Sequence, residues 1–284
     1  MNPAPFTYHR PGTIAEAITL LTQHEDEAKL IAGGHSLLPV MKLRLAEPAH
    51  LIDLTGASDE GLRSVTLDGD TLTIGALVTH RTLERDATIR QAAPLLAETA
   101  THVGDRQVRA RGTLGGTLAH ADPAADYPAA VLAMGGTIVA QGPDGTREIP
   151  VEEFFLGLLT TALSPDEIVI AYRIPAAPAG TGVSYQKVAN QASGYAIIGV
   201  AAQVSGGTVR VGVTGATGTA FRATAVEEAL SGGSIDAAAI DAATAGITDG
   251  MDLLDDIAAS SAYRARLVPG LIKRAVLEAA GRAS

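Results

Sequence analysis

The sequence predicts an α+β fold in which two α/β subdomains precede a small C-terminal α+β domain with an antiparallel sheet and three helices. Short apolar strands and helical segments alternate over the first 176 residues. A Pro- and Ala-rich stretch at 175–180 then has the composition of a linker. Beyond it, a hairpin pattern precedes three helical segments. We expect domains at 1–176, divided into about 1–56 and 57–176, and at 177–284.

The first subdomain begins with a helix. Thr13 is a good N-cap, and Glu16 stands at the capping-box position of a segment that continues to Leu21. Apolar strands are expected at 29–32 and 50–54. The interval between them is judged too short for a full crossover helix, so the pattern does not predict a dinucleotide-binding βαβ unit.

The second subdomain and the C-terminal domain follow from alternation and turn residues. A hairpin is predicted at 64–67 and 71–74, a helix through 95–103, and further strands at 137–140 and 168–171. A second hairpin is predicted at 200–204 and 209–213, turning at Gly206-Gly207. Three helices are expected at 223–230, 236–245 and 261–280.

Composition narrows the function. The 284 residues are 46% hydrophobic with a formal charge of −10 and no basic cluster, which argues against nucleic-acid binding. No apolar run is long enough to span a membrane, and the N-terminus lacks signal-peptide features, so we expect the cytoplasm. The absence of cysteine excludes a disulfide, a thiol nucleophile and a cysteine-ligated iron–sulfur cluster on this chain. Redox chemistry here therefore requires a bound organic cofactor.

Two of five Gly-Gly pairs point to a ligand. The other three fit turns or a helix end. Gly33-Gly34 is followed by His35-Ser36, and Gly115-Gly116 by Thr117. Loops without Cβ atoms let backbone N–H groups converge on a phosphate, and the hydroxyl groups add donors. The sequence therefore predicts two glycine loops, at 32–36 and 113–117, that bind a diphosphate.

The residues around both pairs carry a family resemblance over essentially the whole chain. The segment Ala-Gly-Gly-His-Ser-Leu-Leu-Pro at 32–39 resembles the first FAD signature of the medium subunits of aerobic carbon monoxide dehydrogenases. Gly-Thr-Leu-Gly-Gly-Thr-Leu-Ala-His-Ala-Asp-Pro at 112–123 resembles the second. Both belong to the wider flavoprotein family of molybdenum hydroxylases, which includes the flavin part of xanthine dehydrogenase. Thr117 stands where that family usually has Asn.

The resemblance implies a PCMH-like FAD-binding region with FAD extended between its subdomains. It places one set of residues at the diphosphate and adenosine of FAD. It also gives Val103 and Val169 apolar contacts with the cofactor, and places Asp126 and Lys187 at the flavin end. Lys187 is either a cation near the flavin ring, where it raises the reduction potential, or a solvated strand lysine. The residues assigned to the diphosphate and adenosine are Leu30, Ile31, Ala32, Gly33, Gly34, His35, Ser36, Leu37, Thr113, Gly115, Gly116 and Thr117.

The resemblance also implies a function. The chain is expected to be the FAD-carrying electron-transfer subunit of a molybdenum hydroxylase, with carbon monoxide as the first choice of substrate and no catalytic residue of its own. Its partners are then a large molybdenum-cofactor subunit and a small subunit with 2Fe-2S clusters, assembled as a dimer of heterotrimers. The electron acceptor is a quinone or another oxidant, and the complex offers a route to peripheral attachment at the inner face of the membrane.

Other interpretations stay open at this stage. Gly-Gly-His-Ser also occurs in flavoenzymes whose histidine is bonded to the flavin, so a stand-alone flavin oxidase or dehydrogenase with histidyl-linked FAD at His35 is the alternative. A flavin-binding module without a redox role is a third. Tyr195 either covers the flavin ring or is an ordinary half-buried tyrosine. His120, Asp122 and Asp126 could suggest a metal site, but Pro123 bends the chain between the two carboxylates and no further ligand is evident, so no metal site is predicted.

Overall fold

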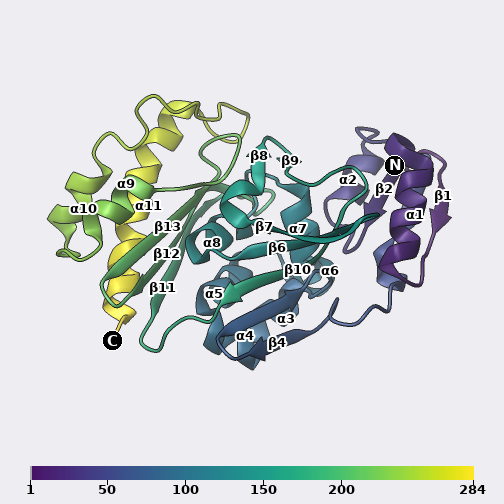
Figure 1. Ribbon diagram of the computed structural model, residues 1–284. Coiled ribbons are helices and arrows are strands. Elements are labelled where there is room, and N and C mark those ends of the chain that lie inside the picture. Colours follow the sequence, from purple (N-terminus) through teal and green to yellow (C-terminus); the bar gives the residue numbers. More distant parts are fainter. Residues whose placement is uncertain (1) are drawn as a thin grey trace.

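Three units follow one another along the chain in the computed structural model, which describes residues 2–284. They lie in a row in Figure 1, with the N-terminal unit in purple at one end, the central unit in the middle, and the C-terminal unit in green and yellow at the other. No helix in the described part of the chain combines the length and the apolar character that crossing a membrane requires.

The N-terminal unit is a three-stranded parallel sheet with two helices. Its sheet has the order β1-β3-β2, and β3 pairs in parallel with both neighbours. Helix α2 lies in the crossover from β2 to β3, so the expectation that this interval is too short for a crossover helix is wrong. The eighteen residues at 32–49 exceed the dozen or so that a parallel connection needs. The elements are β1 (Thr7–His9), α1 (Ile14–His24), β2 (Ala28–Ile31), α2 (Leu37–Lys42) and β3 (His50–Asp53).

Helix α1 begins as its sequence predicts. The Thr13 hydroxyl accepts a hydrogen bond from the Glu16 amide at 3.1 Å, while the Glu16 carboxylate accepts one from the Gly12 amide at 2.7 Å. This arrangement satisfies two amides that the helix itself leaves unpaired. The helix buries Ile14, Ala17, Ile18 and Leu21 in a core that extends to Leu77 and Ile168 of the next unit.

The central unit is a five-stranded antiparallel sheet whose apolar face packs against five helices, while a sixth helix, α6, buries no residue. The strand order is β4-β5-β10-β6-β7, and alternate residues of the strands, such as Leu72 and Ile74, pack against the helices. The strands are β4 (Val65–Asp68), β5 (Thr71–Gly75), β6 (Thr137–Gly142), β7 (Gly145–Pro150) and β10 (Ile168–Pro175), with a small hairpin of β8 (Phe155–Gly157) and β9 (Thr160–Thr161). The helices are α3 (His80–Arg85), α4 (Ala87–Ala92), α5 (Pro94–His102), α6 (Arg106–Arg111), α7 (Leu114–His120) and α8 (Tyr127–Met134).

The second glycine segment is helical, which differs from the loop that the sequence predicts. Gly115 and Gly116 lie in the first turn of α7, and the Thr113 side chain caps that helix by accepting from the Gly116 amide at 3.2 Å. Glycine is a poor helix former, but a threonine N-cap and close tertiary packing outweigh this local preference.

The C-terminal unit is an antiparallel sheet, β11-β12-β13-β14, covered by helices on both faces. Its turn between β12 and β13 is Gly206-Gly207, both with positive φ, as the sequence predicts. Val200 and Ala202 face α11, whereas Ala201 faces α8 of the central unit. The elements are β11 (Gly182–Ala189), β12 (Ala196–Ser205), β13 (Thr208–Thr214), β14 (Phe221–Arg222), α9 (Thr224–Leu230), α10 (Ala237–Thr244) and α11 (Ser261–Arg282).

Candidate functional site

A cleft of about 700 Å³ separates the N-terminal and central units. It follows β2 and the first glycine segment on one side and α7 on the other, and it ends at the loop between β11 and β12. Every residue that the sequence assigns to the cofactor lines this cleft except Lys187. The lining members of that set are Leu30, Ile31, Ala32, Gly33, Gly34, His35, Ser36, Leu37, Val103, Thr113, Gly115, Gly116, Thr117, Asp126 and Val169.

The first glycine segment supplies unpaired amides. Gly34 has a φ of 77°, a conformation that favours glycine. Within residues 2–284, the amides of Gly34, His35 and Ser36 donate to no protein group. Gly33 has a separate reason to lack a side chain, because a Cβ there would lie 2.7 Å from the Cα of Gly112. The first glycine segment (32–36) therefore touches the residue just before the second (113–117), and three amide donors lie beside that contact.

The second glycine segment supplies a wall without side chains. Its first amides are already used, since Leu114 donates to the Val78 carbonyl at 3.0 Å and Gly115 to the Ala76 carbonyl at 2.9 Å. A Cβ on Gly115 would lie 2.5 Å from the Ala76 Cβ, so this glycine allows α7 to pack against the end of β5. Gly116 is exposed and lines the cleft, where it leaves room for a ligand.

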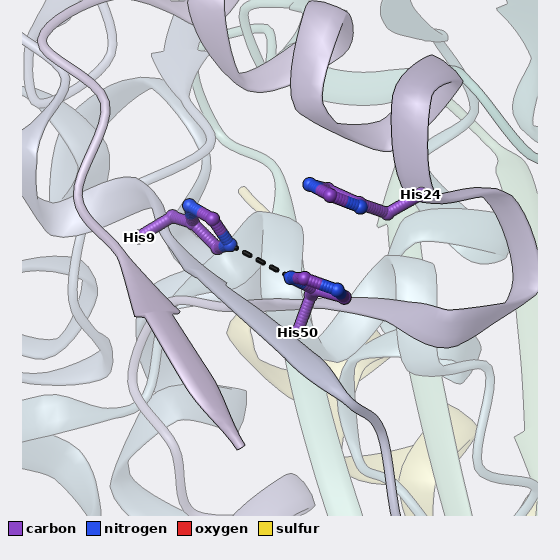
Figure 2. Close-up of side chains that lie close together, drawn as sticks. All are labelled: His9, His24 and His50. Atoms are coloured by element: carbon purple, nitrogen blue, oxygen red, sulfur yellow. Dashed lines mark hydrogen bonds between the residues drawn. The ribbon is translucent and has the colours of Figure 1, made fainter.

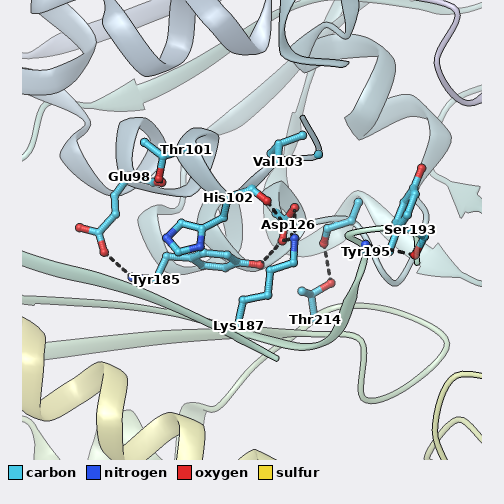
Figure 3. A network of polar contacts seen from close by, with 12 residues as sticks. Glu98, Thr101, His102, Val103, Asp126, Tyr185, Lys187, Ser193, Tyr195 and Thr214 are labelled. Atoms are coloured by element: carbon cyan, nitrogen blue, oxygen red, sulfur yellow. Dashed lines mark hydrogen bonds and ion pairs between the residues drawn. The ribbon is translucent and has the colours of Figure 1, made fainter. Parts of the chain in front are cut away.

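A buried ion pair closes the far end of the cleft. Figure 3 shows Lys187, on β11, pointing at the carboxylate of Asp126, which precedes α8. Lys187 Nζ lies 2.9 Å from Asp126 Oδ1 and donates to the His102 carbonyl at 3.0 Å. Both side chains are about nineteen-twentieths buried, with 5% and 6% exposed. The Tyr185 hydroxyl donates to the same carboxylate at 2.5 Å. The interpretation of Lys187 as a solvated strand lysine is therefore wrong.

Burial controls the charges of this network. Removal from water raises the pKa of the Asp126 carboxyl, and the Lys187 ammonium and the Tyr185 hydroxyl oppose that effect. Burial, then the neighbouring carboxylate, raises the pKa of Tyr185 well above its ordinary value. Tyr185 therefore remains a neutral donor that holds the carboxylate in place.

Other residues also line the cleft without having been assigned to the cofactor, among them His80, Tyr127 and Tyr195. His80 is 3% exposed, and its Nδ1, like the Tyr127 hydroxyl, has no hydrogen-bond partner among residues 2–284. Burial lowers the pKa of His80 to about 3, so its imidazole is neutral. Tyr195, in the loop between β11 and β12, reaches the cleft from the C-terminal unit. Burial raises its pKa, and the Ser36 hydroxyl opposes this. No local pattern distinguishes His80 and Tyr127, because each reaches the cleft only through the fold, whereas Tyr195 was already a candidate from the sequence.

The fold and the cleft define a cofactor-binding protein, and comparisons with known proteins identify its class. The family model of the FAD-binding domain in molybdopterin dehydrogenase matches residues 4–177, and that of the C-terminal domain of the carbon monoxide dehydrogenase flavoprotein matches residues 183–279. The chain belongs to this family of molybdenum hydroxylase flavoproteins.

Individual relatives agree over the full length. A carbon monoxide dehydrogenase medium chain of Hydrogenophaga pseudoflava is 37% identical, covering 97% of both chains. The medium subunit of nicotine 6-hydroxylase from Paenarthrobacter nicotinovorans is 36% identical, again over 97% of both. A solved carbon monoxide dehydrogenase chain from Hydrogenophaga pseudoflava superposes with a TM-score of 0.95 at 39% identity, covering all of both chains. The predicted family, the predicted fold class and FAD as the cofactor are confirmed.

The residues of the cleft fit FAD. Three unpaired amides beside glycine backbone suit a diphosphate, which needs donors and close approach. Apolar side chains, including Val103 and Val169, suit the flat faces of an aromatic ring. The cleft volume lies within the usual range for ligand sites.

Proposed function

We propose that this chain carries FAD as the electron-transfer subunit of a molybdenum hydroxylase, with carbon monoxide as the reducing substrate of the complex. The observation that carries the proposal is the full-length match to a carbon monoxide dehydrogenase medium chain, together with a cleft lined by both glycine segments. FAD supplies the ability to exchange electrons singly or in pairs.

The chain's own residues would hold that cofactor in distinct ways. The amides of Gly34, His35 and Ser36 would donate to the diphosphate, and the bare backbone at Gly116 would allow its approach. Thr113 and Gly115 support this surface by fixing the first turn of α7. The remaining residues assigned from the sequence form the walls of the cleft.

Lys187 and Asp126 would act at the flavin end. Asp126 lines the cleft directly, while Lys187 stands behind it and keeps the carboxylate paired. The ion pair of Asp126 and Lys187 therefore carries little net charge, and the direction of its dipole sets the electric field at that end of the cleft. This differs from a free cation beside the ring, because the ammonium is fully engaged with Asp126 and the His102 carbonyl.

Partners and acceptor complete the proposal. The relatives include medium chains of carbon monoxide dehydrogenase and nicotine 6-hydroxylase, so we assign a large molybdenum-cofactor subunit and a small 2Fe-2S subunit, in a dimer of heterotrimers. The absence of cysteine from this chain agrees with clusters held elsewhere. A quinone acceptor would place the complex in the cytoplasm at the inner face of the membrane.

The proposed domain boundaries use the same elements. We assign the FAD-binding domain to 1–176, with subdomains at about 1–56 and 57–176, and the C-terminal domain to 177–284. Strand β10 ends at Pro175 and β11 begins at Gly182, so the boundary lies between two strands of different sheets.

Anaerobic stopped-flow absorbance tests the function. The flavin of the isolated chain, and of the chain assembled with its large and small subunits, is mixed with carbon monoxide or with an N-heterocyclic substrate such as nicotine. We expect flavin bleaching by carbon monoxide in the assembled complex alone. Direct bleaching of the isolated chain by either compound would refute the subunit role. If only the heterocycle bleached the flavin of the complex, the electron-transfer role would stand and carbon monoxide would be the wrong substrate. Sequence identity does not decide between the two substrates, because the carbon monoxide dehydrogenase and nicotine 6-hydroxylase relatives are 37% and 36% identical to this chain.

A further inference from the structure

Three histidines gather at the outer edge of the N-terminal unit. His9 lies on β1, His24 is the last residue of α1, and His50 is the first residue of β3. Each offers one imidazole nitrogen, and these nitrogens all lie within 4.8 Å of one another. Figure 2 shows the three rings around a common space below the end of the helix. Among residues 2–284, no other group of three His, Cys, Asp or Glu side chains comes this close.

The sheet explains why two of the rings meet. Strands β1 and β3 are parallel, with Thr7 opposite His50 and His9 opposite Ile52. Residues two apart share a face of a strand, so His9 and His50 are on the same face as Ile52, which packs under α1. His24 reaches that face from the end of the helix above it.

We propose that His9, His24 and His50 form a transition-metal site for Zn²⁺ or a related divalent ion. Imidazole is a preferred ligand of such ions, and three histidines leave a fourth position for water. His9 Nε2 and His50 Nδ1 are 2.9 Å apart, close to the ~3.3 Å between two nitrogens bound to one tetrahedral zinc ion. The two nitrogens share a hydrogen bond, and the ion would take the place of its proton after a rotation of each ring.

His24 supplies the adjustable ligand. Its ring stacks on that of His50, with centroids 3.6 Å apart and planes 13° from parallel. Two stacked rings cannot aim their lone pairs at one point, so His24 turns about its side-chain bonds when the ion binds. It has room to do so, because it ends a helix and is only partly buried.

The site is separate from the FAD cleft. None of the three histidines lines that cleft, although Ala28, which pairs with His50 at the start of β2, does; the first glycine segment follows Ile31 at the other end of that strand. The strand separates the two positions by roughly 10 Å. Binding there would join β1, β3 and α1, so the ion stabilises the fold of the N-terminal unit and does not take part in the flavin chemistry.

Zinc titration of the full chain tests the site. The protein is stripped with a chelator and titrated with Zn²⁺ against a chromophoric competitor at pH 7.5. We expect one Zn²⁺ per chain and a rise in Tm on adding it. His9→Gln, His24→Gln and His50→Gln should each weaken zinc binding by about 100-fold or more, since loss of an outer-shell partner alone costs about 10–100-fold. His120→Gln, a partly buried histidine that lines the FAD cleft and lies outside the cluster, is the matched control for zinc affinity alone and should bind zinc normally.

Two results would overturn the proposal. One is a stripped chain that binds no zinc above the level of the three substituted chains. The other is stoichiometric binding that all three substitutions leave unchanged. If His9→Gln or His50→Gln fails to fold, as judged by circular dichroism and flavin content, His24→Gln decides, because its side chain lies at a helix end.

Discussion

Removal of the Lys187 ammonium is the sharpest test of the buried network. Lys187→Met keeps most of the side-chain volume and leaves the Asp126 carboxylate with only the Tyr185 hydroxyl as a partner. Breaking a buried ion pair from one side costs about 3–5 kcal/mol, because the remaining charge stays out of water. We therefore expect the free energy of unfolding to fall by that amount near pH 8.

The loss should depend on pH in a defined direction. Without Lys187, the pKa of Asp126, already raised by burial, rises further in the folded protein. The folded variant then holds a proton that the unfolded chain has lost above about pH 4, and its stability falls as the pH rises toward the folded pKa. For each unit by which the pKa of Asp126 rises within the range from pH 5 to pH 8, the free energy of unfolding of the variant differs by about 1.4 kcal/mol more between those two pH values.

Urea unfolding at pH 5 and pH 8 measures both effects. Lys273→Met is the matched control, since Lys273 pairs with Asp241 on the surface, where an ion pair contributes only about 0–1 kcal/mol. The double variant Asp126→Asn/Lys187→Met removes both charges and should recover most of the loss. If Lys187→Met costs no more than Lys273→Met, or costs the same at both pH values, the pair does not carry a buried charge and the reasoning fails.

Three further outcomes follow from the cleft. Gly33→Ala places a methyl group against the Gly112 backbone and should cost about 1–3 kcal/mol, divided between stability and FAD affinity. The control Gly270→Ala has open space around its position in α11, so it should retain FAD and gain up to about 1 kcal/mol of stability in urea unfolding. Tyr185→Phe removes a donor to a buried carboxylate and should cost about 1.5–3 kcal/mol, and no change in the unfolding midpoint would contradict the network. Acid precipitation should leave the flavin in the supernatant, while flavin in the pellet that His35→Ala releases would establish a histidyl bond.

Local signals predicted the elements whose causes are local. The Thr13 cap with Glu16, and the Gly206-Gly207 turn, involve residues within a few positions of one another, and the structure has both. The family resemblance also predicted a set of residues that line one cleft. By contrast, the helix at Gly115-Gly116 depends on contacts with Ala76, far away in sequence. Glycine propensity alone favoured a loop there.

The charge network could not be predicted in the same way. Asp126 and Lys187 are 61 residues apart, and their pairing depends on α8 packing against the C-terminal sheet. The resemblance placed both near the flavin but did not indicate that they neutralise each other. The three histidines of the N-terminal unit show the same limit, because a parallel sheet and a helix end bring them together without any regular spacing in the sequence.

The contact between the central helices and the C-terminal sheet limits how this protein can be recombined with its relatives. Ala129, Ala130 and Ala133 of α8, and Leu95 of α5, pack against β11 and β12, and a side chain at Gly212 would lie 2.8 Å from the Ala129 carbonyl carbon. A chimera cut in the connection after β10 would join a foreign sheet to these helices. A segment exchanged with a relative therefore has to include α5 and α8 together with the C-terminal sheet, so it extends across the boundary between the domains.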